Sequence, residues 1–284
     1  MLLNEKTKQM LRSMQFSGGR VYLLCGGKGI GRMTYARYVI ADYFNIQMET
    51  LLDYPDYYEL HSEKTLGVGD LSGLWTFTEY MPACGACKVA VIDADALTDE
   101  AQASLLKLLE DGATHVMFIL ILNCRVLDTI RSRCREISFL PVESVKMDTL
   151  AGNPIAKDMA FGKPGLFYVL CEKETFLLTC KNAVDAVLKF DRLRILQSLH
   201  LVKEKDKEAF FECYGKGYTL LWLRYLMDSI QNELSKESPD AERTKKLQQV
   251  ARVVESGYLR MSTGGSYSKN DFFEFVHKLC VLCM

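Results

Sequence analysis

Residues 21–44 read VYLLCGGKGIGRMTYARYVIADYF, and this stretch decides the fold of the first half of the chain. The apolar run VYLLC has the length of a buried strand. It leads into a glycine-rich turn, and apolar residues then recur at helical spacing from Met33 to Phe44. A strand, a glycine loop and a helix in this order predict the start of an α/β domain, and they are typical of loops that bind phosphate.

The glycines fit such a loop better than the residues that follow them. Gly26, Gly29 and Gly31 have the spacing that lets backbone N–H groups point at phosphate oxygens. A working loop continues with a lysine for the phosphates and a hydroxyl for magnesium, but Arg32 and Met33 stand there. A guanidinium is not equivalent to an ammonium, and a thioether is not a magnesium ligand. We therefore expect the relic of a nucleotide site; a functional loop and a plain strand-to-helix turn are the alternatives.

The rest of the first half continues the α/β pattern. Further strands are expected at residues 56–60, 89–92, 116–122 and 137–139. The run VMFILIL at 116–122 is apolar throughout, as a strand buried on both faces is. Helical patterns alternate with these runs, so a parallel sheet is predicted within residues 1–140. Beyond residue 140 only helical patterns follow, which indicates a small helical part over 141–172 and an all-α domain over 173–284.

The composition is that of an ordinary globular protein. Hydrophobic residues make up 49% and charged residues 25% of the 284 positions, which excludes a disordered chain. The formal net charge of −1 argues against a protein that coats nucleic acid by bulk charge. The ten cysteines are scattered through apolar stretches, and no apolar run is long enough to span a bilayer. We expect a cytoplasmic protein with reduced thiols and no membrane partner.

A second motif follows the third predicted strand. The stretch KVAVIDADALTDEAQASLLKLLED (88–111) places Asp93 at a strand end, where ATPases hold magnesium through a carboxylate. In an active ATPase the next residue is typically a glutamate that orients water, but here it is Ala94. Asp95 lies two positions along and need not face the same site, while Thr98 is expected to cap the next helix. Taken alone, an Asp-rich strand end is common turn chemistry.

Four stretches together carry a family resemblance. These are PDYYELHSEK (55–64), residues 88–111, the strand that ends at Asn123, and TIRSRC (129–134). They resemble bacterial DNA polymerase III clamp-loader subunits of the AAA+ class, most closely the delta-prime type. The resemblance is good over residues 20–140 and holds only in outline beyond. It implies an AAA+ α/β domain with a degenerate P-loop (1–140), a helical lid (141–172) and a helical collar domain (173–284).

The resemblance also assigns roles to single residues. Arg133, in the Ser-Arg-Cys motif, corresponds to an arginine finger that acts in trans at a neighbouring subunit's nucleotide site. Asn123 corresponds to sensor 1, which contacts the γ-phosphate or its attacking water. FGKPGLF resembles the lid motif, but Leu166 replaces its arginine. Four positions of the family's active site are thus altered in this chain. They hold Arg32, Met33, Ala94 and Leu166, which implies a subunit that does not hydrolyse ATP itself.

The implied function is that of a stator subunit. Neighbouring motor subunits of a hetero-pentameric ring would bind ATP, open the sliding clamp and place it on primed DNA, and Arg133 would complete the adjacent ATP site. Two alternatives stay open, an ATP-hydrolysing motor subunit and a clamp-loader-like scaffold outside replication. The helix over 218–234, with its apolar stripe, is a candidate for collar packing or for a core within its own domain.

No cofactor is expected, and the sequence leaves open whether ATP lodges in the loop without turnover. Many bacterial relatives carry a four-cysteine zinc module after the P-loop helix, but residues 35–56 contain no cysteine, so that module is predicted to be absent. Cys84/Cys87 and Cys280/Cys283 are single pairs, whereas structural zinc needs four ligands. His61 and His115 are expected to have ordinary structural roles.

Overall fold

The computed structural model describes residues 2–62, 64–110, 114–123, 126–199, 210–236, 240–263 and 269–283, with the backbone alone for 210–216 and 269–270. Contacts divide the chain into two compact units. The first holds Met1–Leu150 and Gly162–Leu166, and the second holds Ala151–Phe161 and Phe167–Met284. No helix in the described ranges is both long and apolar enough to cross a membrane.

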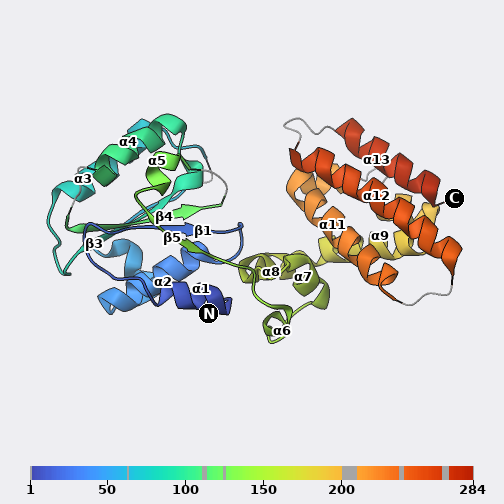
Figure 1. Ribbon diagram of the computed structural model, residues 1–284, viewed down its shortest axis with the longest axis horizontal. Coiled ribbons are helices and arrows are strands. Elements are labelled where there is room, and N and C mark those ends of the chain that lie inside the picture. The colour runs from blue at the N-terminus through green and yellow to red at the C-terminus, as the bar shows by residue number, and fades with distance from the viewer. Residues whose placement is uncertain are drawn as a thin grey trace. The chain divides into compact units, whose positions relative to one another are not determined.

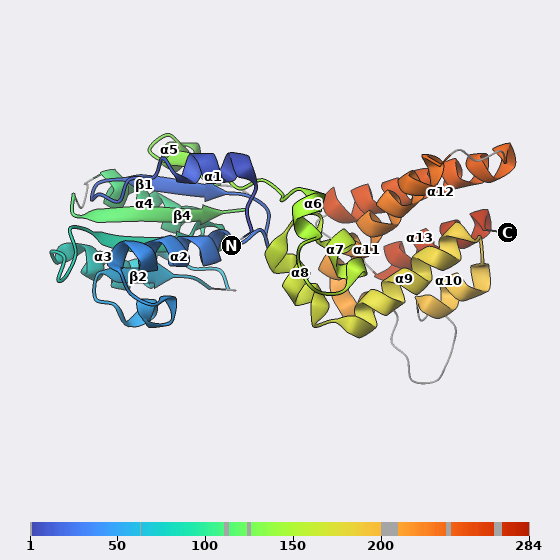
Figure 2. The same cartoon turned by 90° about the horizontal axis from the view of Figure 1, so that it is seen from below.

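A parallel sheet forms the centre of the first unit, as the sequence predicts. Its strands are β1 (Val21–Cys25), β2 (Tyr57–Leu60), β3 (Lys88–Asp93), β4 (Val116–Leu122) and β5 (Arg135–Ser138). Their order in the sheet is β2-β3-β4-β1-β5, and every pairing is parallel. The strands β1 and β4 lie side by side in the middle (Figure 2). Because all strands run the same way, their carboxyl ends meet at one edge.

Helices cover both faces of this sheet (Figure 1). Helices α1 and α2 lie on one face, and α3, α4 and α5 lie on the other. The helices of the unit are α1 (Glu5–Leu11), α2 (Arg32–Phe44), α3 (Ser72–Glu79), α4 (Asp99–Glu110), α5 (Asp128–Arg131) and α6 (Ser144–Met147), with 3₁₀ turns at Met48–Asp53, Val68–Leu71 and Ala94–Ala96. Helices α1 and α3 were not among the predicted elements. Thr98 caps α4 as expected, since its hydroxyl accepts from the Ala101 N–H at 3.1 Å.

The two faces of the sheet bury separate cores. Along β1, Tyr22 and Leu24 pack into the core beneath α1 and α2, whereas Leu23 packs into the core beneath α3 and α4. Every residue of β4 is buried, as its uninterrupted apolar sequence predicts. Each Å² of apolar surface that is buried stabilises the fold by about 25 cal/mol, so this two-sided core is the main source of stability.

Asp56 anchors the turn that precedes β3. Its side chain accepts hydrogen bonds from the backbone N–H groups of Ala83, Cys84 and Gly85 at 2.6, 2.7 and 2.8 Å. Burial acts to raise the pKa of this carboxyl, but the three N–H donors outweigh it, and the pKa lies below its ordinary value. The strand predicted from residue 56 begins one residue later, at Tyr57, although the Asp56 carbonyl still accepts from the Val89 N–H of β3 at 2.8 Å.

The second unit is entirely helical in its described part. It comprises α7 (Pro154–Ala160), most of α8 (Pro164–Cys171), α9 (Glu174–Leu188), α10 (Arg192–Ser198), α11 (Phe210–Leu234), α12 (Ala241–Thr263) and α13 (Lys269–Leu282). Helix α12 packs against both α11 and α13, and Figure 1 shows it between them. The same helices are seen from below in Figure 2. Trp222, Leu226 and Ile230 on α11 are fully buried within the chain, so this stripe forms the core of its own unit.

The lid segment is divided between the units. Helix α7 packs on α9 and α11 of the second unit, whereas residues 162–166 belong to the first. A lid separate from the collar, over 141–172, stays a prediction.

Candidate functional site

The glycine loop joins β1 to α2 at the carboxyl edge of the sheet. Gly26, Gly29 and Gly31 have φ angles of +156°, +83° and +97°, which residues with a Cβ rarely adopt. The three glycines singled out in the sequence are therefore required by the backbone itself. This requirement holds for a phosphate-binding loop and for a tight turn alike.

Two N–H groups of the loop already have partners within the protein. The Gly26 N–H donates to the Leu122 carbonyl at 3.0 Å, which continues the pairing of β1 with β4. The Lys28 N–H donates to the side-chain oxygen of Asn123, also at 3.0 Å. A phosphate-binding loop directs such N–H groups at its ligand. Here the side chain of Asn123, the predicted sensor 1 residue, binds the loop directly.

The segment Gly162–Leu166 packs on the same loop. The Leu166 N–H donates to the Gly29 carbonyl at 3.1 Å. A Cβ placed on Gly29 would lie 3.0 Å from the Leu166 Cβ, and one on Gly27 would lie 3.2 Å from the Lys163 Nζ. Residues of the lid motif thus lie in van der Waals contact with the backbone that would surround a phosphate.

The two residues that replace the lysine and the hydroxyl begin helix α2. Arg32 is buried, with 7% of its surface exposed. Met33 packs against the core between the sheet and the helices α1 and α2. The thioether therefore contributes to hydrophobic packing at a position where a nucleotide site needs a magnesium ligand.

Asp93, at the end of β3, has both carboxylate oxygens engaged. One oxygen accepts from the Asp95 N–H at 3.2 Å, and the other lies 2.8 Å from Nδ1 of His61. His61 follows β2, which pairs with β3 in register up to Leu60 and Ile92. Only a structural role is expected for His61 from the sequence. Its place beside Asp93 follows from the strand register, which the sequence does not reveal.

Asp95 also belongs to this edge. Its carboxylate accepts a hydrogen bond from the backbone N–H of Asn123, whose side chain holds the Lys28 N–H. The sequence left open whether Asp95 faces the same site as Asp93. The structure joins Asp95, Asn123 and the glycine loop in one chain of hydrogen bonds. The groups that would bind magnesium, water and phosphate in a nucleotide site are thus hydrogen-bonded to one another.

Arg133 occupies a different kind of position. It follows α5 and precedes β5, and its guanidinium donates to the Thr129 carbonyl at 2.8 Å and to the carboxylate of Glu110 at the end of α4. Its side chain is 39% exposed. The structure therefore brings the glycine loop, Asp93 and Asn123 together, while the hydrogen bonds of Arg133 are made to α4 and α5.

The cysteine of the same motif is a packing residue. Cys134 donates its thiol to the Ile130 carbonyl at 3.1 Å, and burial raises its pKa to about 12. A thiol with so high a pKa stays protonated at neutral pH, so it is not a nucleophile. Cys134 fixes the backbone next to Arg133 by closing the turn after α5.

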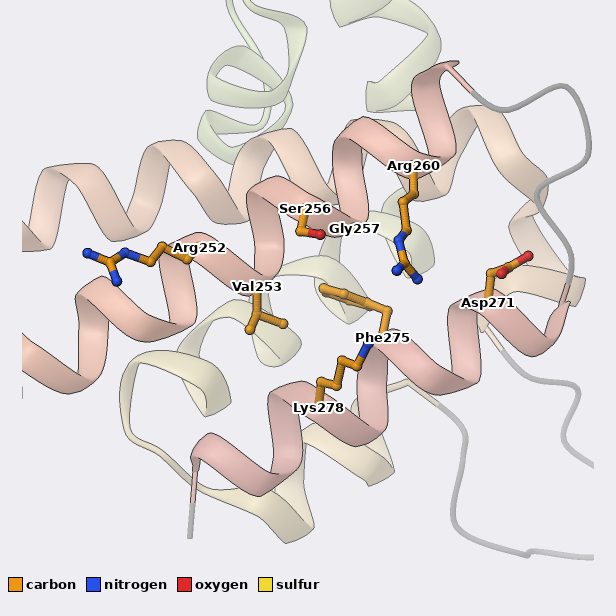
Figure 3. Close-up of a pocket in the computed structure, with 8 residues that line it drawn as sticks. All are labelled: Arg252, Val253, Ser256, Gly257, Arg260, Asp271, Phe275 and Lys278. Carbon is orange, nitrogen blue, oxygen red and sulfur yellow. The ribbon is translucent and has the colours of Figure 1, made fainter.

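A cavity of about 150 Å³ lies between α12 and α13 of the second unit (Figure 3). Gly257 allows the Phe275 ring to approach closely, since a Cβ there would lie 2.6 Å from the ring. Glu274 pairs with Lys278 at 2.5 Å and with Arg260 at 3.8 Å, which offsets the positive charge of the rim. Across the described residues, no three His, Cys, Asp or Glu side chains form a metal site.

Comparisons with known proteins show what the chain is similar to. Residues 3–143 match the family model described as DNA polymerase III, delta subunit. Over 88 residues the chain is 42% identical to the DNA polymerase III subunit delta' of Escherichia coli, covering 29% of this chain and 26% of that protein. Over 139 residues it is 31% identical to the replication factor C small subunit of Methanoculleus marisnigri, covering 47% and 42%.

A solved structure extends the likeness to the whole chain. The DNA polymerase III gamma-subunit-related protein of Thermotoga maritima superimposes with a TM-score of 0.58 at 15% identity, covering 99% of this chain and all of that one. The chain matches less than half of the length of the curated relatives named above. Residues 3–143 therefore belong to the clamp-loader family, whose proteins have the AAA+ fold. Within that family they are similar to the DNA polymerase III delta-prime type.

Proposed function

We propose that this chain is the non-hydrolysing stator subunit of a DNA polymerase III clamp loader in the cytoplasm. It supplies Arg133 to the ATP site of a neighbouring motor subunit in a hetero-pentameric ring. The ring loads the sliding clamp on primed DNA. One contrast carries the proposal: the polar groups of the predicted nucleotide site hydrogen-bond to one another, whereas the guanidinium of Arg133 binds α4 and α5 instead and its side chain is 39% exposed.

The chain's own site lacks the groups that hydrolysis requires. Ala94 cannot orient an attacking water, and the Met33 side chain cannot hold magnesium. The remaining carboxylate, Asp93, is occupied by His61 and by the Asp95 N–H. Leu166 packs against Gly29 in place of a cationic lid residue. We therefore propose that the subunit turns over no ATP and needs neither a nucleotide nor zinc to act.

Arg133 has the chemistry of a residue that acts in trans. A guanidinium presents several N–H donors in a plane, which match phosphate oxygens, and it stays charged at any physiological pH. In phosphoryl transfer such a group stabilises the charge that develops on the γ-phosphoryl oxygens. The exposed position beside Cys134 and α5 leaves Arg133 accessible to a partner.

The second unit would serve as the collar domain that holds the ring together. Because Trp222, Leu226 and Ile230 are buried in the chain's own core, collar contacts must use other side chains. Large apolar residues are exposed on several helices of this unit, and they include Leu178, Leu193, Leu259 and Val281. Their distribution over α9, α10, α12 and α13 is consistent with more than one neighbour.

The decisive experiment is the DNA- and clamp-stimulated ATPase rate of a loader reconstituted with the organism's own motor subunits. It compares the wild-type chain, Arg133→Ala and a loader without the chain. Arg131→Ala is the matched control, because Arg131 is a similarly exposed cation two residues away that pairs with Glu136 at 3.0 Å. We expect the ATPase rate to fall strongly with Arg133→Ala but not with Arg131→Ala, while the ring still assembles. An unchanged rate would leave a scaffold without a finger.

A second experiment separates the stator from a motor subunit. The isolated chain is titrated with fluorescent ATP and with ADP, in the presence and absence of magnesium. We expect no saturable binding in the millimolar range, because the glycine loop is occupied by the chain's own groups. Magnesium-dependent binding accompanied by turnover would favour the motor alternative.

A further inference from the structure

The guanidinium of Arg133 is held at two points by its own subunit. One terminal nitrogen donates to the Thr129 carbonyl at 2.8 Å, and the other donates to the carboxylate of Glu110. The two anchors come from different helices, α5 and α4. A long side chain that is fixed at both ends of its planar group keeps one orientation.

Glu110 itself stands on a rigid support. It is the last residue of α4, whose Leu105 and Leu108 are buried against the sheet. The helix is capped by Thr98 at its other end. A carboxylate on a packed helix is better placed to orient a functional group than one on a loop. Both side chains of the Arg133–Glu110 ion pair are partly exposed, and such a pair contributes little to the free energy of unfolding.

We propose that Glu110 is the positioning residue of the arginine finger. Its carboxylate holds the guanidinium of Arg133 in the orientation in which the remaining N–H donors meet the γ-phosphoryl group of the neighbouring subunit. This inference rests on the proposed function, since it requires that Arg133 act in trans. Glu110 touches no nucleotide, so its whole effect passes through Arg133.

The test uses the reconstituted loader with Glu110→Gln, which keeps the shape of the side chain and removes its charge. We expect kcat of the stimulated ATPase to fall by about ten- to hundredfold, because misplacing a catalytic group by about 1 Å has effects of this size. KM for ATP should change little, since the finger acts mainly on the transition state. Glu136→Gln is the matched control: it removes a similarly exposed ion pair beside the same motif and should leave kcat unchanged.

A double variant separates positioning from a general structural effect. If Glu110 acts only through Arg133, adding Glu110→Gln to Arg133→Ala causes no further loss of kcat. Losses that multiply would overturn the positioning role. Should Glu110→Gln impair assembly, Glu110→Asp keeps the charge but withdraws it by one methylene, and a partial loss of kcat is expected.

The outcomes also distinguish this inference from the function on which it rests. If Arg133→Ala leaves turnover unchanged, the proposed function fails. If Arg133→Ala abolishes turnover while Glu110→Gln and Glu110→Asp match the wild type, only the role of Glu110 fails.

Discussion

At the glycine loop, polar groups of the first unit bind one another: Asn123 holds the Lys28 N–H, and His61 lies against Asp93. At the Arg133 segment, by contrast, the backbone is fixed from inside by Cys134 while the guanidinium remains at the surface. In one region the polar groups of the predicted nucleotide site hydrogen-bond to one another. The other has kept a charged group accessible to a partner.

The two regions are joined by the sheet. The glycine loop follows β1, and Arg133 lies two residues before β5, which pairs with β1 from Tyr22 and Arg135 onward. A subunit can lose its own catalytic chemistry and still offer a well-placed residue to a neighbour, since fold and site are separable.

The largest expected effect comes from testing one residue of each region in the same reconstituted loader. Arg133→Ala should lower the stimulated ATPase by about 10³-fold, the size expected when an arginine finger is removed. Asp93→Asn, which changes the carboxylate of the chain's own site, should leave turnover unchanged. Assembly is checked by gel filtration for both variants. A large loss with Asp93→Asn would mean that the closed site still hydrolyses ATP.

The next effect concerns the stability of the first unit, in which Asp56 holds the turn before β3. Asp56→Ala should lower the free energy of unfolding by about 3 kcal/mol, because three N–H groups lose a charged acceptor. Asp53→Ala is the control, because Asp53 is exposed and lies nearby on the chain. Urea denaturation followed by circular dichroism measures both. Equal stability of the two variants would contradict the anchoring role of Asp56.

The same carboxyl gives a pH dependence with a definite sign. The pKa of Asp56 is lower in the folded protein than its ordinary value of 3.8. Its contribution is therefore fully present above that value and is lost as the pH falls through it toward the lower folded pKa. The stability difference between wild type and Asp56→Asn should shrink as the pH is lowered from 6 to about 3. A stability difference that stays constant over this pH range would contradict the lowered pKa of Asp56.

Buried strands could be predicted from the sequence almost residue by residue. The bounds of β1 and β4 are those expected, because apolar residues fill every position of a strand that is covered on both faces. The last strand was expected at 137–139 but spans Arg135–Ser138. It lies at the edge of the sheet, where backbone pairing with β1 sets its bounds and its exposed residues are polar.

The glycines, Asp93 and Asn123 could be placed at the sheet edge from the sequence, because each follows a predicted strand. The contacts of His61, Asp95 and Glu110 could not be predicted. They depend on strand register and on where helix α4 ends, and no local pattern encodes these features. Helix α1 was also missed, because only Thr7 and Leu11 of its residues are buried, which leaves a weak apolar pattern.

Two glycine substitutions test how tightly the segment 162–166 packs on the glycine loop. Gly29→Ala should lower the free energy of unfolding by about 2 kcal/mol, because alanine is strained at a φ of +83° and its Cβ would lie 3.0 Å from that of Leu166. Gly69→Ala meets no atom within 4 Å and should change stability little. Thermal unfolding of both variants is the measurement. A neutral Gly29→Ala would contradict both the backbone strain at Gly29 and the packing of Leu166 on the loop.

The smallest effect tests the hydrogen bond that closes the loop. Asn123→Ala should lower the free energy of unfolding by about 1 kcal/mol, since the Lys28 N–H loses its acceptor at a site partly open to water. Hydrogen exchange at the Lys28 amide should become faster, while the Gly26 amide, bonded to Leu122, should keep its protection. Asn232→Ala, on the exposed face of α11, is the control and should leave both amides unchanged. Slow exchange at Lys28 in Asn123→Ala would mean that another group closes the loop, whereas faster exchange with undiminished loader ATPase would separate the closed site from the function of Arg133.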